Sequence, residues 1–195
     1  MRFRVLNADP LYDYREACYI TLGKDLSKEP DLKQPKDITA YWIKQIIANH
    51  STIRSVRFRI IDTRPKTVIA QLIRATKEHP QPYVQSSRPD WNGGKERSSD
   101  PYEEILFGQD HTAPSFVEMA KQRLCTRTEG PTRTAMKELV NQMRQSDDPF
   151  IKAVGFCCEP ACCYGGCPEI KSCGMTDNKR YEKFLNTYEF VKTRL

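Results

Sequence analysis

Two short groups of polar residues have the types and spacing to bind an anion. Gln71 and Arg74 are three residues apart in a stretch with helical periodicity, so their side chains share one helix face. A proline-containing segment then leads to Ser86, Ser87 and Arg88, which offer two hydroxyls, backbone amides and a second guanidinium. Guanidinium groups bind phosphate and carboxylate through paired hydrogen bonds. The sequence therefore predicts a phosphate or nucleotide site, with a solvent-exposed polar loop as the alternative.

A separate cysteine-rich segment, 157–173, holds six of the eight cysteines. Four thiolates presented by short loops are typical ligands of structural zinc. The predicted ligands, with three, four and five residues between them, are Cys158, Cys162, Cys167 and Cys173. Cys157 and Cys163 are alternatives to their neighbours. An iron–sulfur cluster and a metal-free set of thiols also remain open, and Cys18 and Cys125 are predicted to be buried thiols.

Length and composition indicate one domain with a small appendage. The 195 residues are 38% hydrophobic, which is enough for a core. We predict an α+β domain over 1–155, followed by a Cys-rich segment and a C-terminal helix over 156–195. The net charge of +6 is spread along the chain, which fits an anionic small ligand and argues against a dedicated nucleic-acid-binding face.

The sequence shows no apolar region typical of a secretory signal and no apolar run near the ~18 residues of a membrane span. We therefore expect a soluble, cytoplasmic protein with no membrane partner. In that compartment thiols are reduced, so metal ligation or burial is expected of the cysteines before disulfide formation.

Hydrophobic periodicity places these groups in an α+β fold with a short antiparallel sheet and several helices. The predicted strands are 2–7, 17–22 and 56–60. The predicted helices are 37–49, 66–78, 115–127, 132–146, one from 149 and one from 177. Ser115 and Glu118 have the spacing of a capping box that would open the third of these helices. Two proline-rich or glycine-rich stretches, 24–36 and 89–114, are predicted to be loops.

The first polar stretch resembles the signature region of the flavin-dependent thymidylate synthases. In that family a helix carries Gln-x-x-Arg-His-Arg, and the loop that follows ends in Ser-x-Arg; here 71–74 and 85–88 match the two ends. The resemblance implies that Gln71, Arg74 and the Ser86–Arg88 loop contact deoxyuridylate, and that Arg74 also lies against the flavin. The second and third positions of Arg-His-Arg are Ala75 and Thr76, so Thr76 stands where the family contacts flavin.

Three other segments resemble the same family in the same order along the chain. His50 and Thr52 match the His-x-Ser/Thr-Pro element that contacts flavin. Lys121, with Arg123 as a neighbouring substitute, matches the nucleotide-contacting arginine of Ala-Arg-x-x-Leu-Pro. Arg144 matches the late Leu-Arg-x-Asp arginine, which is credited with favouring ionisation of the pyrimidine N3. The resemblance therefore implies a catalytic role for Arg144.

The activity implied by the resemblance is reductive methylation at C5 of deoxyuridylate. It would use FAD, with NADPH and methylene-tetrahydrofolate as co-substrates, in a homotetramer by analogy. Ala75 and Thr76 favour an alternative, a nucleotide-binding protein of the same fold that has lost flavin chemistry. A further alternative is a zinc-bearing nucleic-acid-binding protein that stacks bases on Tyr83, Trp91 and Tyr102.

Overall fold

A four-stranded antiparallel sheet is the base of the molecule. The computed structural model describes residues 1–174 except 26, 29, 31–32, 77, 79–80, 87, 92, 95–97 and 165–166. The strands are β1 (Arg2–Val5), β2 (Arg57–Pro65), β3 (Pro82–Val84) and β4 (Glu104–Thr112), in the order β1-β2-β4-β3. The predicted α+β class with a short antiparallel sheet is confirmed.

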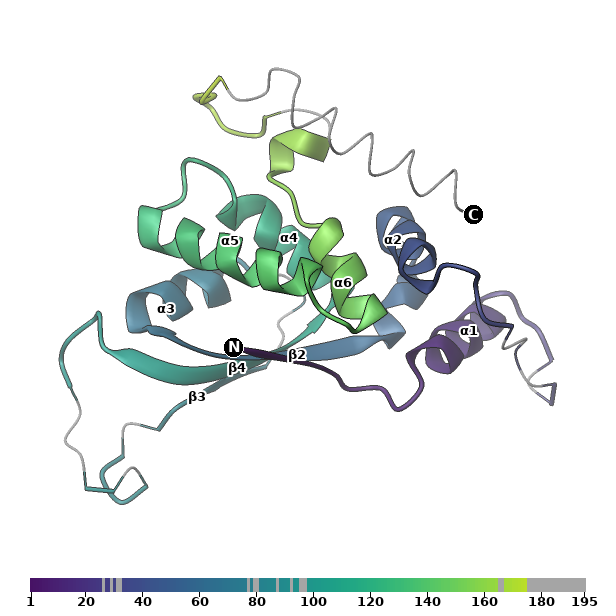
Figure 1. The fold of residues 1–195 in the computed structure, drawn as a ribbon, viewed down its shortest axis with the longest axis horizontal. Coiled ribbons are helices and arrows are strands. Elements are labelled where there is room, and N and C mark those ends of the chain that lie inside the picture. The colour runs from purple at the N-terminus through teal and green to yellow at the C-terminus, as the bar shows by residue number, and fades with distance from the viewer. Residues whose placement is uncertain are drawn as a thin grey trace.

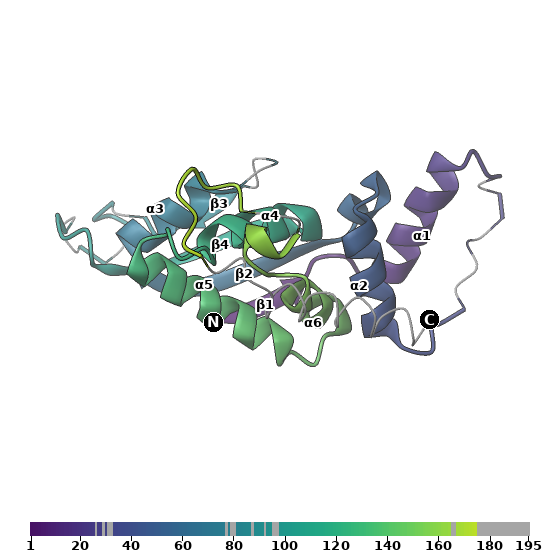
Figure 2. The same cartoon turned by 90° about the horizontal axis from the view of Figure 1, so that it is seen from above.

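Helices cover one face of this sheet and one of its ends (Figures 1 and 2). Over the face lie α3 (Lys66–Arg74), α4 (Ala113–Arg123), α5 (Gly130–Arg144) and α6 (Pro149–Phe156). At the end lie α1 (Pro10–Thr21), α2 (Ile38–Ala48) and the 3-10 turn η1 (Ser51–Ser55). A second 3-10 turn, η2 (Ala161–Tyr164), lies on the far side of the helical layer from the sheet. None of the helices described is both long and apolar enough to cross a bilayer.

The core fills the space between the sheet and the helices. Phe58 from β2, Phe116 from α4 and Phe150 from α6 are at most 1% exposed and meet edge to face. Trp42 extends this cluster onto α2, with its ring 5.1 Å from that of Phe150. A continuous apolar core therefore holds α2, α4 and α6 against the sheet.

Aspartate caps set the starts of three helices. The carboxylates of Asp9, Asp37 and Asp148 accept hydrogen bonds from backbone N–H groups in the first turns of α1, α2 and α6. The helices predicted after Asp37 and Asp148 are confirmed, and the helix predicted over 132–146 is α5.

The strand predicted over 17–22 is wrong, because these residues lie in and just after α1. Asp9 and Pro10 form a strong helix start, and the helix runs through the apolar residues that follow. Tyr14 then packs its ring 5.5 Å from that of Trp42, so packing against α2 selects the helix. A short apolar run does not by itself distinguish a strand from a helix.

The loop predicted over 89–114 is also wrong, because its second half forms β4, the strand between β2 and β3. Its buried inner face carries Phe107, but also Gln109 and His111, which are each 1% exposed. Polar residues at core positions hid the alternation of apolar and polar residues on which the prediction depended.

Helices α3 and α4 have other boundaries than predicted, and α4 ends at Arg123 instead of at 127. The α4 N-cap is Thr112, whose hydroxyl accepts from the Ser115 N–H at 3.3 Å, so the capping box predicted from Ser115 is wrong. Helix α3 ends at Arg74 instead of continuing to 78, since Glu78 has the left-handed φ of 67°. The helix predicted from 177 lies outside the described residues.

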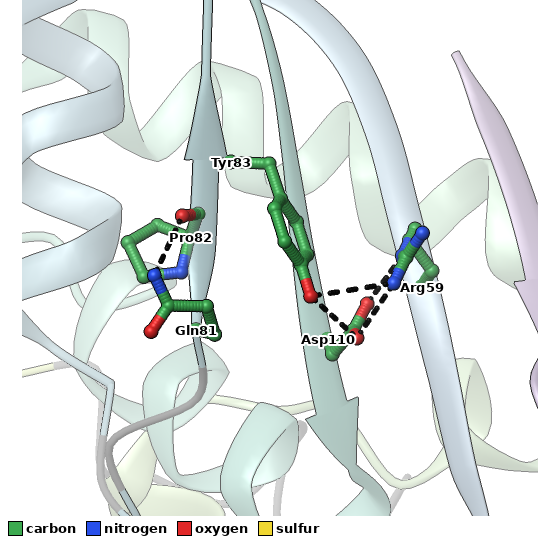
Figure 3. A network of polar contacts seen from close by, with 5 residues as sticks. All are labelled: Arg59, Gln81, Pro82, Tyr83 and Asp110. Atoms are coloured by element: carbon green, nitrogen blue, oxygen red, sulfur yellow. Dashed lines mark hydrogen bonds and ion pairs between the residues drawn. The ribbon is translucent and has the colours of Figure 1, made fainter.

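The face of the sheet that the helices leave uncovered carries a polar network (Figure 3). The Arg59 guanidinium of β2 donates two hydrogen bonds to the Asp110 carboxylate of β4, from Nε at 2.5 Å and from Nη2 at 2.8 Å. The Tyr83 hydroxyl of β3 donates to the same carboxylate at 3.3 Å, and its ring lies beneath the guanidinium. The ion pair lowers the pKa of Asp110 and raises that of Arg59. The network therefore joins three strands and neutralises its own charge.

Candidate functional site

Arg74 and Arg123 end helices α3 and α4, and the charge of Arg74 acts on Arg123. Arg74 is the last residue of α3 and is exposed, while Arg123 is the last residue of α4 and is half-buried. The Arg123 Nε atom is buried and has no hydrogen-bond partner within the part of the chain that the structure describes. Burial lowers the pKa of Arg123, and the nearby charge of Arg74 lowers it further. Over the same described residues, neither guanidinium forms an ion pair.

This arrangement favours an anion between the two guanidiniums. Two like charges in a partly desolvated site repel each other. A buried N–H without an acceptor costs about 1–3 kcal/mol. A phosphate or carboxylate would supply both the opposite charge and the missing acceptor, through charge-assisted hydrogen bonds.

The chain just after α3 is fixed against β4 and α4. The Thr76 hydroxyl donates to the Leu72 carbonyl at 3.0 Å and lies 3.6 Å from the Met119 sulfur. The buried Gln109 amide of β4 donates to the same hydroxyl at 3.5 Å. Ala75 is only 4% exposed. These contacts hold the end of α3 in place but leave Ala75 and Thr76 with little to offer a ligand. Sequence reasoning missed Gln109, because it missed the strand that carries it.

An ion pair ties the predicted flavin-contacting turn to this region. Arg54 of η1 pairs with Glu78 at 2.7 Å, and Glu78 also accepts a hydrogen bond from the Thr112 hydroxyl at 2.6 Å. The same turn carries Thr52, which is 8% exposed, and follows directly on His50, which is exposed. The structure therefore connects the His50–Thr52 turn to the end of α3 and the start of α4. No sequence motif marks the Arg54–Glu78 pair.

The predicted Ser-x-Arg loop stands apart from the two arginines. Arg88 pairs with Asp90 at 2.6 Å and lies 5.2 Å from the centre of the Trp91 ring. The Ser86 hydroxyl accepts from the Arg88 N–H at 3.2 Å, and Ser87 lies outside the described residues. In the described stretches, no hydrogen bond or ion pair joins this loop to the α3–α4 arginines. The half-buried Gln71 lies with Arg74 on α3, so the structure brings part of the predicted nucleotide set together and leaves the loop separate.

The two remaining predicted basic residues make contacts within the chain. Arg144 donates from Nε to the Gly155 carbonyl and from Nη2 to the Cys158 carbonyl and the Glu159 carboxylate, each at 2.9 Å. It thereby closes the C-terminal end of α6, where carbonyl groups carry partial negative charge. It also borders a surface hollow of about 170 Å³. Lys121 pairs with Glu118, and its ammonium lies 4.4 Å from the centre of the Tyr164 ring.

The six clustered cysteines separate into two groups. Cys157, Cys158 and Cys163 are at most 2% exposed and belong to the buried interior. Burial raises the pKa of Cys157 to about 12 and that of Cys158 well above its usual value. The other three thiols, and with them Cys125, line one pocket of about 50 Å³. The predicted ligand Cys158 is thus buried, whereas its three predicted co-ligands, Cys162, Cys167 and Cys173, face the pocket.

The structure forms no disulfide among the eight cysteines, all of which lie in its described part. All eight cysteines are thiols. Among the described residues, no three His, Cys, Asp or Glu side chains are positioned to hold a metal ion. Cys18 and Cys125, predicted as buried thiols, are both half-buried.

Comparison with known proteins adds no relative, since no protein family and no curated protein matches the chain by sequence.

Proposed function

We propose that this chain binds a pyrimidine nucleotide, with deoxyuridylate as the ligand and its phosphate between Arg74 and Arg123. The observation that carries the proposal is the Arg123 guanidinium, whose Nε is buried without a hydrogen-bond partner among the described residues and on which the charge of Arg74 acts. A phosphate dianion matches the combined charge of two arginines and offers several acceptor oxygens. The resemblance to flavin-dependent thymidylate synthases supports the nucleotide, because it assigns Gln71 and Arg74 to nucleotide contacts, with Arg123 as the neighbouring substitute for Lys121.

The flavin half of the resemblance fits these residues poorly. Ala75 is buried and has no polar side chain, and the Thr76 hydroxyl is bonded to the Leu72 carbonyl. Thr52 is also buried, which leaves His50 and Arg74 as the exposed side chains of the predicted flavin set. We therefore derive no step through FAD. Nucleotide binding is the proposed function, and reductive methylation of deoxyuridylate is the second candidate, supported by the order of the four matching segments.

Calorimetric titration of the purified chain with deoxyuridylate tests the proposal. Deoxyuridine, which lacks the phosphate, should bind at least about tenfold more weakly. Arg74→Gln and Arg123→Gln should each weaken deoxyuridylate binding about 10- to 100-fold, since a hydrogen bond to a charged group contributes about 1.5–3 kcal/mol. The matched control is Arg4→Gln, an exposed arginine of β1. Binding of equal strength in all three variants would refute the site.

A second measurement separates the candidate functions. Flavin absorbance bands together with tritium release from 5-tritiated deoxyuridylate would support the synthase. A colourless protein that binds deoxyuridylate and releases no tritium would support binding alone. Strong, salt-dependent binding to oligonucleotides without deoxyuridylate binding would support the nucleic-acid alternative instead.

A further inference from the structure

The pocket lined by cysteines lies between the end of α4 and the Cys-rich segment. Cys162, Cys167 and Cys173 come from that segment, and Cys125 comes from the turn that follows α4. The three cysteines of the Cys-rich segment that do not line the pocket are buried in the interior. The fold therefore selects three of the six clustered thiols and adds a fourth from a distant part of the sequence.

The contacts of Arg127 hold these two parts of the chain together. Its Nε and Nη2 donate to the Lys171 carbonyl at 3.2 and 2.9 Å, which holds the irregular stretch between Cys167 and Cys173 against the turn. The Arg127 backbone N–H also points at the Cys125 sulfur, 3.5 Å away. An N–H group aimed at a sulfur stabilises that sulfur as a thiolate, as outer-shell groups do around metal ligands.

A buried hydroxyl at the same pocket also lacks an acceptor. Thr126 lines the pocket, and its Oγ1 atom is buried with no hydrogen-bond partner within the described part of the chain. A thiolate is an acceptor that a thiol-lined pocket can supply. The pocket is also lined by Arg127, whose positive charge would offset excess negative charge at its centre, and by two further charged residues: Glu169, and Lys121, which is paired with Glu118.

We propose that Cys125, Cys162, Cys167 and Cys173 form a tetrahedral zinc site. Each thiol releases its proton to solvent, and four thiolates around Zn²⁺ leave a net charge of −2, which Arg127 offsets in part. With Zn–S bonds of about 2.3 Å, tetrahedral geometry places the sulfurs roughly 3.8 Å apart. The thiols do not yet converge to this extent, so metal binding draws the Cys-rich segment against α4. The site replaces Cys158 of the sequence-based ligand set with Cys125, and it does not depend on the proposed nucleotide function.

Metal analysis of the full chain, purified under reducing conditions without chelator, tests the site. We expect about one zinc per chain, and four-thiolate charge-transfer absorption after exchange for cobalt. Cys125→Ser should lose most of the zinc, whereas Cys158→Ala and Cys18→Ser should keep it, with circular dichroism to verify the fold of each. Zinc retained by Cys125→Ser but lost from a folded Cys158→Ala would overturn the ligand assignment. Iron with acid-labile sulfide, or no metal, would overturn the zinc site itself.

Alkylation of the unaltered chain gives an answer even if a variant fails to fold. Iodoacetamide followed by peptide mass spectrometry should show the four proposed ligands protected, and removal of zinc by a chelator should expose them together. Cys18, half-buried on α1, should react at the same rate before and after chelation. Protection that a reductant removes and a chelator does not would indicate disulfides and refute the site.

Discussion

Acidification tests the burial of His111, the inward-facing histidine of β4. Its ring is 1% exposed and packs against Phe58 and Phe116, with ring centres 5.9 and 5.3 Å away. Nδ1 lies 3.3 Å from the Ser115 hydroxyl, and Nε2 has no partner among the described residues. Burial lowers the pKa of His111 to about 3, although the charge of neighbouring Asp110 acts in the opposite direction.

The sign and size of the effect follow from this pKa. The unfolded chain binds a proton on this ring near pH 6.5, and the folded chain does so only near pH 3. The folded state is therefore favoured fully above pH 6.5, and this contribution is lost as the pH falls from about 6.5 toward 3. Each pH unit within that window removes about 1.4 kcal/mol, so the loss between pH 7 and pH 5 is about 2 kcal/mol.

Urea unfolding of the unaltered chain and of His111→Asn at several pH values measures the effect. Asparagine retains a polar group for Ser115 but does not titrate, so its smaller volume gives an offset that does not depend on pH. The difference in unfolding free energy between the two chains should change by about 2 kcal/mol between pH 7 and pH 5. His50→Asn, at an exposed position, is the matched control and should keep the parent pH dependence. A difference that stays constant to within about 0.5 kcal/mol would refute the reasoning.

Three further substitutions test packing and polar contacts, each by urea unfolding at pH 7. Gly155→Ala should destabilise the fold by about 1–3 kcal/mol, because a Cβ atom there would lie 2.8 Å from the Arg144 backbone nitrogen. Gly130→Ala, in open space, is its control and should be neutral or stabilising. Asp110→Asn should lower the free energy of unfolding by about 1–3 kcal/mol, since it removes the carboxylate to which Arg59 donates at 2.5 and 2.8 Å. Arg144→Met should cost a similar amount, because three acceptors at the end of α6 lose their donor.

The outcomes that would contradict these predictions differ. Equal stability of the two glycine variants would mean that α5 and α6 are not in close contact. A neutral Asp110→Asn would mean that the network on the uncovered face of the sheet contributes little. A fully stable Arg144→Met would show that Arg144 is dispensable for the fold. Arg144 would then again be a candidate for contacting a ligand.

Those parts of the fold with strong local signals could be predicted from the sequence. Asp37 and Asp148 cap their helices through a local hydrogen bond that depends on a few adjacent residues. Strand β2 alternates Phe58 and Ile60 with arginines, so it shows both its period and its buried face.

The missed elements depend on tertiary contacts. Strand β4 places Gln109 and His111 in the core, where the Gln109 amide meets the Thr76 hydroxyl and the His111 Nδ1 atom meets the Ser115 hydroxyl, both from other elements. No local pattern contains those partners. Cys125 likewise carries no sequence pattern of a metal ligand, because the other cysteines of its pocket lie more than 30 residues further along the chain. The predicted ligand set was chosen from cysteines that are close in sequence. The fold instead separates buried cysteines from those that line the pocket.

The positions of Arg74 and Arg123 admit a simpler explanation, since both are in the last turns of helices. Basic residues are favoured there because they complement the partial negative charge of the terminal carbonyls. That explanation requires only that each side chain be near its own helix end and in water. It does not account for a buried Arg123 Nε that has no acceptor among the described residues, nor for the charge of Arg74, which raises the cost of charging Arg123. An external anion accounts for both features, which is why the nucleotide proposal depends on this pair and not on the separate Ser86–Arg88 loop.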